Sequence, residues 1–242
     1  MRGVTVRIAM WSGPRNISTT MMRSFSSRAD CAVSDEPFYG CFLKATGADH
    51  PLREEVIAAM DCDWHSVAAA LRGGAPGGKP VWYQKHMPHH MTGPVSIADF
   101  PGHRHAFLIR EPERVIASYG VKNGAARIED LGYVRLLEYF EWAQAAGLDP
   151  AVVDTSSFLS DPAGKLAALC ERLGIARDPA MLHWPAGIHP ADGIWASHWY
   201  DQVAASTGFG PPPGPLPELT GQAAELAAQC RPYSEAMRTF AI

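Results

Sequence analysis

The sequence has few cysteines and no closely spaced pair of them. An odd number of cysteines in a chain of 242 residues is not typical of a disulfide framework. The five are Cys31, Cys41, Cys62, Cys170 and Cys230. No apolar run reaches the roughly 18 residues that a membrane span needs, and no leader peptide precedes the first apolar segment. These absences predict a cytoplasmic protein without a membrane anchor.

An excess of positive charge is also missing. The chain has 21 Lys and Arg against 25 Asp and Glu, a net charge of −4. This balance argues against a general nucleic-acid or membrane-surface binder, but it allows a local basic pocket for an anion. Hydrophobic residues make up 47% of the chain, enough for the core of one domain over residues 1–242. Nothing in the sequence indicates an oligomeric state.

Strand-like and helix-like segments alternate along the chain. The predicted strands are 4–10, 31–34, 80–84, 105–109 and 151–154. The predicted helices are 112–123, 130–146, 162–173 and 218–231. The alternation predicts an α/β protein, a three-layer sandwich with a mostly parallel central sheet. The sheet region covers about 4–174, and an aromatic segment and a helix make up 175–242.

The loop after the first predicted strand lacks the lysine of a nucleotide-triphosphate loop. Its spacing approaches G-x-x-x-x-G-K-[ST] from Gly13, but Ser18 replaces the second glycine and Thr19 replaces the lysine. A strand-to-helix loop still directs backbone N–H groups and the positive helix end at one point. With Arg15 and two hydroxyls, this loop suits a single phosphate or phosphosulfate better than a triphosphate with magnesium. An ordinary capped turn is the alternative.

A second strand-to-helix junction places a cation at a strand end. Arg110 follows the strand 105–109, at the edge where open α/β sheets bind ligands. Ser118 lies about two helical turns further on and can share an anion with Arg110. A surface ion pair with Glu111 or Glu113 is the alternative for this arginine.

Together the two junctions resemble a known family. The pattern P-R-x-x-[ST]-[ST] after the first strand and R-x-P-x-x-x-x-x-S after a later one are similar to the motifs of sulfotransferases that use 3′-phosphoadenosine 5′-phosphosulfate (PAPS). The resemblance implies a P-loop-like sulfotransferase architecture with PAPS as co-substrate and no required metal. It places the 5′ side on the first loop and the 3′-phosphate on Arg110 and Ser118. The loop residues concerned are Gly13, Arg15, Asn16, Ser18, Thr19 and Thr20.

The first loop departs from the family pattern at one position. Family loops commonly read P-R-S-G-[ST]-T, whereas Asn16-Ile17 stands here in place of Ser-Gly. A β-branched residue resists positive φ, so the sequence predicts that close backbone approach at Ile17 is disfavoured. The departure favours a non-catalytic nucleotide-binding protein as a rival interpretation.

Two acids and a lysine mark further strand ends. Asp35 and Glu36 follow the second strand, and sulfuryl transfer to a hydroxyl needs a base for the acceptor proton. Glu-Pro followed by aromatics resembles a segment of carbohydrate-type sulfotransferases, which makes Glu36 the expected base and Asp35 the second choice. Lys85 and His86 follow the third strand, where either is placed to stabilise the leaving phosphate and His86 is an alternative base.

Other candidates are weaker. The histidines in Lys85-His86-Met87-Pro88-His89-His90 lack the cysteine pair or H-E-x-x-H helix of a zinc site, so we predict no metal. The aromatics between His183 and Tyr200 fit an acceptor pocket, adenine stacking or core packing. The sequence therefore predicts a PAPS-dependent sulfotransferase acting on a small-molecule hydroxyl or amine. A P-loop small-molecule kinase is the other rival, disfavoured by Thr19 in place of the loop lysine.

Overall fold

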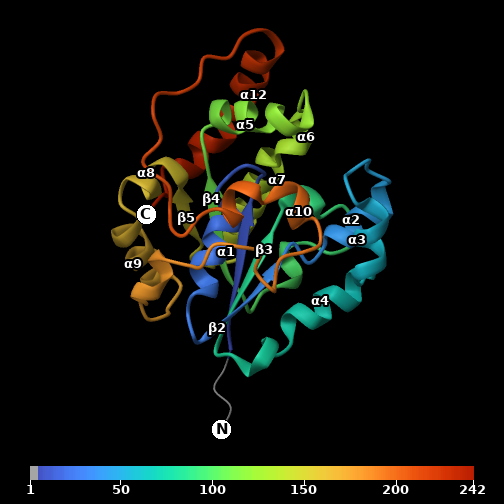
Figure 1. The fold of residues 1–242 in the computed structure, drawn as a ribbon, viewed down its shortest axis with the longest axis vertical. Helices are drawn as coiled ribbons and strands as arrows, with labels where there is room; N and C mark the ends of the chain where they lie inside the picture. The colour runs from blue at the N-terminus through green and yellow to red at the C-terminus, as the bar shows by residue number, and fades with distance from the viewer. Residues whose placement is uncertain (1–4) are drawn as a thin grey trace.

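A five-stranded parallel sheet forms the centre of the molecule (Figure 1). The computed structural model describes residues 5–242, the side chains of residues 122 and 123 excepted. The strands are β1 (Val6–Ser12), β2 (Cys31–Asp35), β3 (Val81–His86), β4 (Arg104–Ile109) and β5 (Ala151–Asp154). All five predicted strands are present, although Val4, the expected start of the first, lies outside the described residues. Every neighbouring pair is parallel, in the order β2-β3-β1-β4-β5.

Helices follow most strands. The α-helices are α1 (Ser18–Ser26), α2 (Tyr39–Thr46), α3 (Arg53–Ala59), α4 (Trp64–Arg72), α5 (Pro112–Asn123), α6 (Ile128–Leu131), α7 (Tyr133–Ala145), α8 (Thr155–Ser160), α9 (Pro162–Arg172), α10 (Ala196–Trp199), α11 (Asp201–Ala204) and α12 (Gly221–Arg238). Short 3₁₀ turns are η1 (Pro76–Gly78), η2 (Pro88–His90), η3 (Ile97–Asp99) and η4 (Pro179–Leu182). Within residues 5–242 no helix is long and apolar enough to cross a membrane.

The predicted helices hold with two corrections. The prediction of one helix over 130–146 is wrong, because Gly132 adopts φ 71° and separates α6 from α7. The last helix is longer than predicted and continues through Pro232 to Arg238. In contrast, α5 has the predicted bounds, and Asp161 caps α9 by accepting a hydrogen bond from the Gly164 amide.

Both faces of the sheet are buried, as a parallel sheet requires. Ile8 and Met10 of β1 pack with α1, α8 and α9, whereas Ala9 and Trp11 pack on the other face with α4 and α7. Figure 1 shows α8 and α9 on one side of the strands and α4 on the other. This arrangement is the predicted three-layer α/β sandwich.

The carboxyl ends of all strands meet at one edge of the sheet, because the strands are parallel. The strand order reverses at β1, which lies between β3 and β4. Open α/β sheets bind ligands at such a reversal. The ends of β1, β2, β3 and β4 and the segments that follow them carry the sequence-predicted site residues. The third strand is longer than predicted, so Lys85 and His86 end β3 and do not follow it.

Candidate functional site

The loop after β1 adopts an unusual backbone. Arg15 and Ile17 have φ values of 56° and 44°, in the left-handed region. Left-handed residues in a loop turn successive N–H groups toward one point and form an anion-binding concavity. The prediction that Ile17 disfavours this geometry is therefore wrong, since Ile17 adopts the conformation that glycine favours. Its side chain packs against the core beside α1, which stabilises the strained backbone.

The N-terminus of α1 is available for an anion. Ile17 occupies the N-cap position and makes no side-chain capping bond. The first N–H groups of a helix have no partner within the helix, and they carry the positive end of its dipole. Ser18 and Thr19 begin the helix beside the cavity described below. The anion site that the sequence predicts at this helix start stays a prediction, and an N-terminus without a side-chain cap leaves room for it.

Arg15, Arg110 and Ser118 form one cluster, although 95 residues or more separate the loop from the other two. Arg15 Nε donates to Ser118 Oγ at 2.8 Å, and Arg110 Nη1 donates to the Arg15 carbonyl at 2.6 Å. The Nε atom of Arg110 is buried and has no hydrogen-bond partner within the described residues. Burial lowers the pKa of both arginines. Two partly desolvated guanidinium groups with spare donors favour an anionic ligand.

Asn16 and Gly13 fix the position of the loop. Asn16 is buried; its amide nitrogen donates to the Leu108 carbonyl at 2.7 Å, and its oxygen accepts from Thr155. These bonds tie the loop to the end of β4 and the start of α8. Gly13 is not among the residues that line the cavity, and its contact with the co-substrate stays a prediction. A Cβ atom there would lie 2.5 Å from the Leu131 carbonyl oxygen, so glycine permits the close approach of α6.

A buried charge cluster lies where β2 and β3 end. Lys85 Nζ donates to Asp35 at 2.8 Å, Glu36 at 2.6 Å and the Tyr200 hydroxyl at 2.7 Å. Burial disfavours the Lys85 ammonium, but Asp35 and Glu36 outweigh it and raise the Lys85 pKa well above its usual value. The lysine is therefore a permanent cation.

Glu36 and Asp35 take different positions in this cluster. Asp35 is 1% exposed at its side chain and accepts from the Tyr200 hydroxyl at 2.7 Å behind the cavity wall. Glu36 is 11% exposed, lines the cavity and has φ 44°, a strained value for a residue before proline. Burial raises the Glu36 pKa, with Lys85 opposing the shift. Of the two acids, only Glu36 lines the cavity, where a base can reach a bound acceptor.

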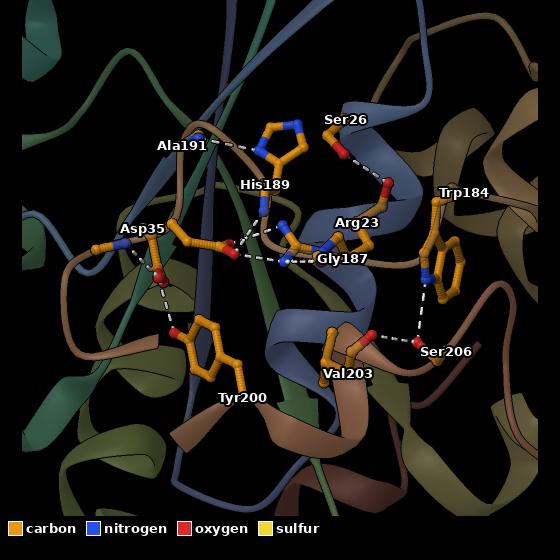
Figure 2. A network of polar contacts seen from close by, with 12 residues as sticks. Arg23, Ser26, Asp35, Trp184, Gly187, His189, Ala191, Tyr200, Val203 and Ser206 are labelled. Atoms are coloured by element: carbon orange, nitrogen blue, oxygen red, sulfur yellow. Dashed lines mark hydrogen bonds and ion pairs between the residues drawn. The ribbon is translucent and has the colours of Figure 1, made fainter. Parts of the chain in front are cut away.

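The segment that contributes Tyr200 is held to α1 by a buried ion pair. Arg23 forms two hydrogen bonds with Asp192, at 2.7 and 2.5 Å, and both side chains are almost completely buried. Figure 2 shows Arg23 reaching from α1 to this segment and Tyr200 pointing toward Asp35. The Gly193 amide also approaches Asp35, at 3.5 Å. The Arg23–Asp192 pair thus connects α1 to the segment that forms the wall near Lys85.

The histidines after β3 do not act as one group. His86 is 1% exposed, stacks on Trp11 with ring centroids 4.5 Å apart, and lies within hydrogen-bond distance of Gln84. It does not line the main cavity, which argues against His86 as the alternative base. His90 does line it, with Nδ1 3.8 Å from Glu36 Oε2. In the described part of the chain, no three His, Cys, Asp or Glu side chains are grouped to hold a metal ion.

The loop after β1, the charged residues Glu36 and Lys85, and His90 line a cavity of about 350 Å³ at the carboxyl edge of the sheet. The predicted residues in its wall are Arg15, Asn16, Ser18, Thr19, Thr20, Glu36, Lys85, Arg110 and Ser118. The remaining wall is mostly aromatic: Tyr39, Phe42, His50, His89, His90, Tyr119, Trp195, Trp199 and Tyr200, with Pro14, Ile17, Met87, Asp130, Gln202 and Val203. One side of the cavity is therefore cationic and the other is aromatic.

Sequence reasoning missed part of the aromatic side. Tyr39, Phe42 and His50 lie in and after α2, a helix that was not predicted, and the Tyr39 hydroxyl lies 2.9 Å from His50 Nδ1. The Glu-Pro-Phe-Tyr sequence after β2 was the available indication, since aromatics directly after a strand-end acid face the same edge. Trp195 and Trp199 were predicted only as members of an aromatic segment with three possible roles.

Comparison with known proteins agrees with the geometry. A family model described as a sulfotransferase domain matches residues 6–241. The chain is 35% identical over 232 residues to the branched-chain-amino-acid aminotransferase-like protein 2 of Arabidopsis thaliana, and 38% identical over 205 residues to protein 1 of that name. The matches cover 96% and 85% of this chain but only 41% and 37% of the relatives. The chain thus spans about two fifths of each curated relative.

Solved structures share the fold at low identity. The sulfotransferase domain from the curacin biosynthetic pathway matches with a TM-score of 0.50 and 13% identity, covering 95% of this chain and 98% of that one. The sulfotransferase domain from the Synechococcus PCC 7002 olefin synthase matches with a TM-score of 0.53 and 16% identity, covering 94% and 95%.

Proposed function

The chain belongs to the sulfotransferase family, and from this we propose that it transfers a sulfuryl group from PAPS to a small-molecule hydroxyl or amine. The observation that carries the proposal is the cluster of Arg15, Arg110 and Ser118 beside an uncapped helix N-terminus. The Arg110 Nε atom, which has no partner within the described residues, and the first amides of α1 are donors that fit the two phosphate ends of such a co-substrate.

Each side of the cavity has a separate task in this proposal. Arg15, Ser18, Thr19 and the α1 amides hold the 5′-phosphosulfate end, while Arg110 and Ser118 hold the 3′-phosphate. When bound, PAPS supplies the sulfuryl group. Lys85, a permanent cation at the cavity wall, stabilises the negative charge that develops on the departing phosphate oxygen.

The acceptor occupies the aromatic side. Glu36 lies there as an accessible carboxylate with a raised pKa, and it promotes removal of the acceptor proton. The only lysine in this part of the wall, Lys85, already has Asp35 and Glu36 as partners. An anionic acceptor would find no unpaired cation there among the described residues, so we expect an uncharged or cationic acceptor.

One comparison of ligands tests the proposal. Thermal shifts are measured with adenosine 3′,5′-bisphosphate, AMP, and ATP with magnesium. Charge-assisted hydrogen bonds contribute about 1.5–3 kcal/mol, so loss of the 3′-phosphate should weaken binding at least about tenfold. A larger magnesium-dependent shift with ATP would favour the kinase alternative. Binding of the bisphosphate without transfer of labelled sulfate to any hydroxyl or amine compound would favour the non-catalytic alternative.

A further inference from the structure

Asp130 is a carboxylate in the cavity wall that the proposed reaction leaves without a task. It lies in α6 and lines the cavity. Its Oδ2 atom accepts a hydrogen bond from the Arg127 amide at 3.0 Å, which fixes the side chain at the start of the helix. Among the described residues that line the cavity, Glu36 and Asp130 are the two carboxylates, and only Glu36 has a bond to Lys85.

The charge of Asp130 is weakly neutralised compared with that of Glu36. Lys85 Nζ lies 2.6 Å from Glu36, and the lysine side chain is 1% exposed. The cation on Asp130 is Arg127, whose Nη2 atom lies 3.6 Å away on a side chain that is 75% exposed. Water screens such a surface pair, so it contributes little. Asp130 therefore keeps a negative charge that a ligand can meet.

The titratable groups that face Asp130 are uncharged near pH 7. Burial lowers the pKa of His50 and lowers that of His89 to about 4, although Asp130 opposes both shifts. Burial also raises the pKa of Tyr119, and Asp130 raises it further. None of these three side chains supplies a positive charge opposite the carboxylate. A cation from outside the chain would do so.

The aromatic side of the cavity favours the same kind of ligand. The faces of aromatic rings attract cations, and quaternary ammonium groups are recognised by walls of this composition. Trp195 and Tyr39 meet nearly perpendicularly at 5.1 Å, and Trp195 Nε1 donates to the Tyr200 hydroxyl at 3.2 Å, so these rings are held in place. Lys85 Nζ already lies 5.0 Å from the Tyr200 ring centroid. This side of the cavity therefore combines aromatic rings with a carboxylate.

We propose that the acceptor is a hydroxyl compound that carries a separate ammonium group, held between Asp130 and the aromatic wall. The proposal rests on the proposed function and narrows its acceptor from uncharged or cationic to cationic. The acceptor oxygen bonds to sulfur while the bond between sulfur and the 5′-phosphate oxygen breaks, and its electron pair stays on that oxygen. The hydroxyl proton passes to Glu36. The ammonium group keeps its charge, so the product is a zwitterionic sulfate ester.

Matched compounds test the charge of the acceptor. The probes are choline and tyramine, each compared with the uncharged compound in which carbon replaces the nitrogen and with the acid in which a carboxylate replaces the ammonium group. Calorimetric titration into protein saturated with adenosine 3′,5′-bisphosphate measures their binding without turnover. At least one ammonium probe should bind about tenfold or more tightly than both of its counterparts. The kcat/KM values for transfer of labelled sulfate should follow the same order.

One substitution tests the role of the carboxylate. Asp130→Asn keeps an oxygen for the Arg127 amide and removes the charge, so the preference for the ammonium probe should fall to within about threefold. Binding of the uncharged counterpart and of the bisphosphate should be unchanged. The matched control is Glu129→Gln, because Glu129 lies in the same helix and also pairs with Arg127, at 4.0 Å, but is not among the cavity residues. It should retain the preference.

Two results would overturn the proposal. In the first, neither ammonium probe binds more tightly than its uncharged and acidic counterparts, although the bisphosphate is bound. In the second, an ammonium preference persists undiminished in Asp130→Asn, which would remove this carboxylate as the anchor. Failure of adenosine 3′,5′-bisphosphate to bind the unsubstituted protein would instead reject the proposed function, so the two failures are distinguishable.

Discussion

The molecule contains two groups of histidines, buried except for the half-buried His89, that differ in their hydrogen bonding. The core histidines are His86, His103 and His105, on the face of the sheet that packs against Trp11 and Phe100. The cavity histidines are His89 and His90. His105 accepts from Trp11 Nε1 and lies 3.1 Å from the Phe100 carbonyl oxygen, whereas His89 Nδ1 and His90 Nδ1 have no partner within the described residues.

Burial has the same electrostatic effect on both groups but a different chemical outcome. It lowers the pKa of His105 to about 4 and that of His89 to about 4. The ring nitrogens of the core histidines lie within hydrogen-bond distance of Trp11, Gln84 and Phe100. These histidines therefore contribute to stability and are unavailable for chemistry. The cavity histidines keep a nitrogen free. The hydrogen-bond partners of the ring nitrogens, rather than burial or pKa, distinguish a structural histidine from one that is available for chemistry.

The largest expected effect concerns the carboxylate at the cavity. Glu36→Gln should lower turnover by a factor of about 10²–10⁴, because the amide keeps the shape and removes the charge that supports proton transfer. Affinity for adenosine 3′,5′-bisphosphate should stay within about threefold, measured by titration. Glu138→Gln on the exposed surface of α7 is the matched control. Near-normal turnover of Glu36→Gln together with an inactive Asp35→Asn protein would transfer the role to Asp35.

The core group should respond in stability instead. His105→Leu leaves Trp11 Nε1 and the Phe100 carbonyl without their partners, and each unsatisfied buried group costs about 1–3 kcal/mol. Chemical denaturation should therefore show a lower free energy of unfolding, while bisphosphate affinity is retained. His90→Phe should show the opposite pattern, with stability kept and turnover lost. The comparison of the two groups breaks down if both variants lose stability equally.

A third substitution tests the cationic side of the cavity. Arg110→Ala should weaken bisphosphate binding by at least about tenfold, equivalent to about 1.5–3 kcal/mol for a charge-assisted contact. Circular dichroism should show an intact fold. Arg104→Ala, at the opposite and exposed end of β4, is the control and should bind normally. An unchanged dissociation constant for Arg110→Ala would assign this arginine to its bond with the Arg15 carbonyl alone.

The smallest effect is a pH dependence of stability. Burial lowers the pKa of His103 to about 3 and that of His105 to about 4, so both are neutral in the folded chain at neutral pH. Their unfolded pKa is near 6.5, and the unfolded chain therefore binds more protons as the pH falls below that value. Stability is full above about pH 6.5 and declines toward pH 4, by at most roughly 1.4 kcal/mol per histidine for each pH unit. His105→Leu should show a shallower decline in urea titrations at pH 7, 6 and 5, and an equal slope would contradict the argument.

The sequence predicted more of the fold than of the site. Alternating apolar residues and Gly or Pro boundaries located each strand, and Asp161-Pro162 located the start of α9, because these signals are local. Gly132 was not recognised as a helix break, although it adopts φ 71° between α6 and α7, because a single glycine is also tolerated inside a helix. The prediction of the aromatic wall was incomplete because α2 is only eight residues long and its N-cap, Phe38, makes no side-chain capping bond.

The sequence by itself determined which residues lie near the strand ends: Arg15, Glu36, Lys85 and Arg110 each lie within three residues of the end of a strand. A parallel sheet must bring such residues to one edge, whatever the details of packing. Only the tertiary structure decided the rest. It turned Glu36 toward the cavity and Asp35 behind it, since β2 ends at Asp35 and the backbone turns at Glu36 with φ 44°. It also sent His86 to the core and His90 to the cavity, four residues apart, because the end of β3 and the η2 turn face different partners.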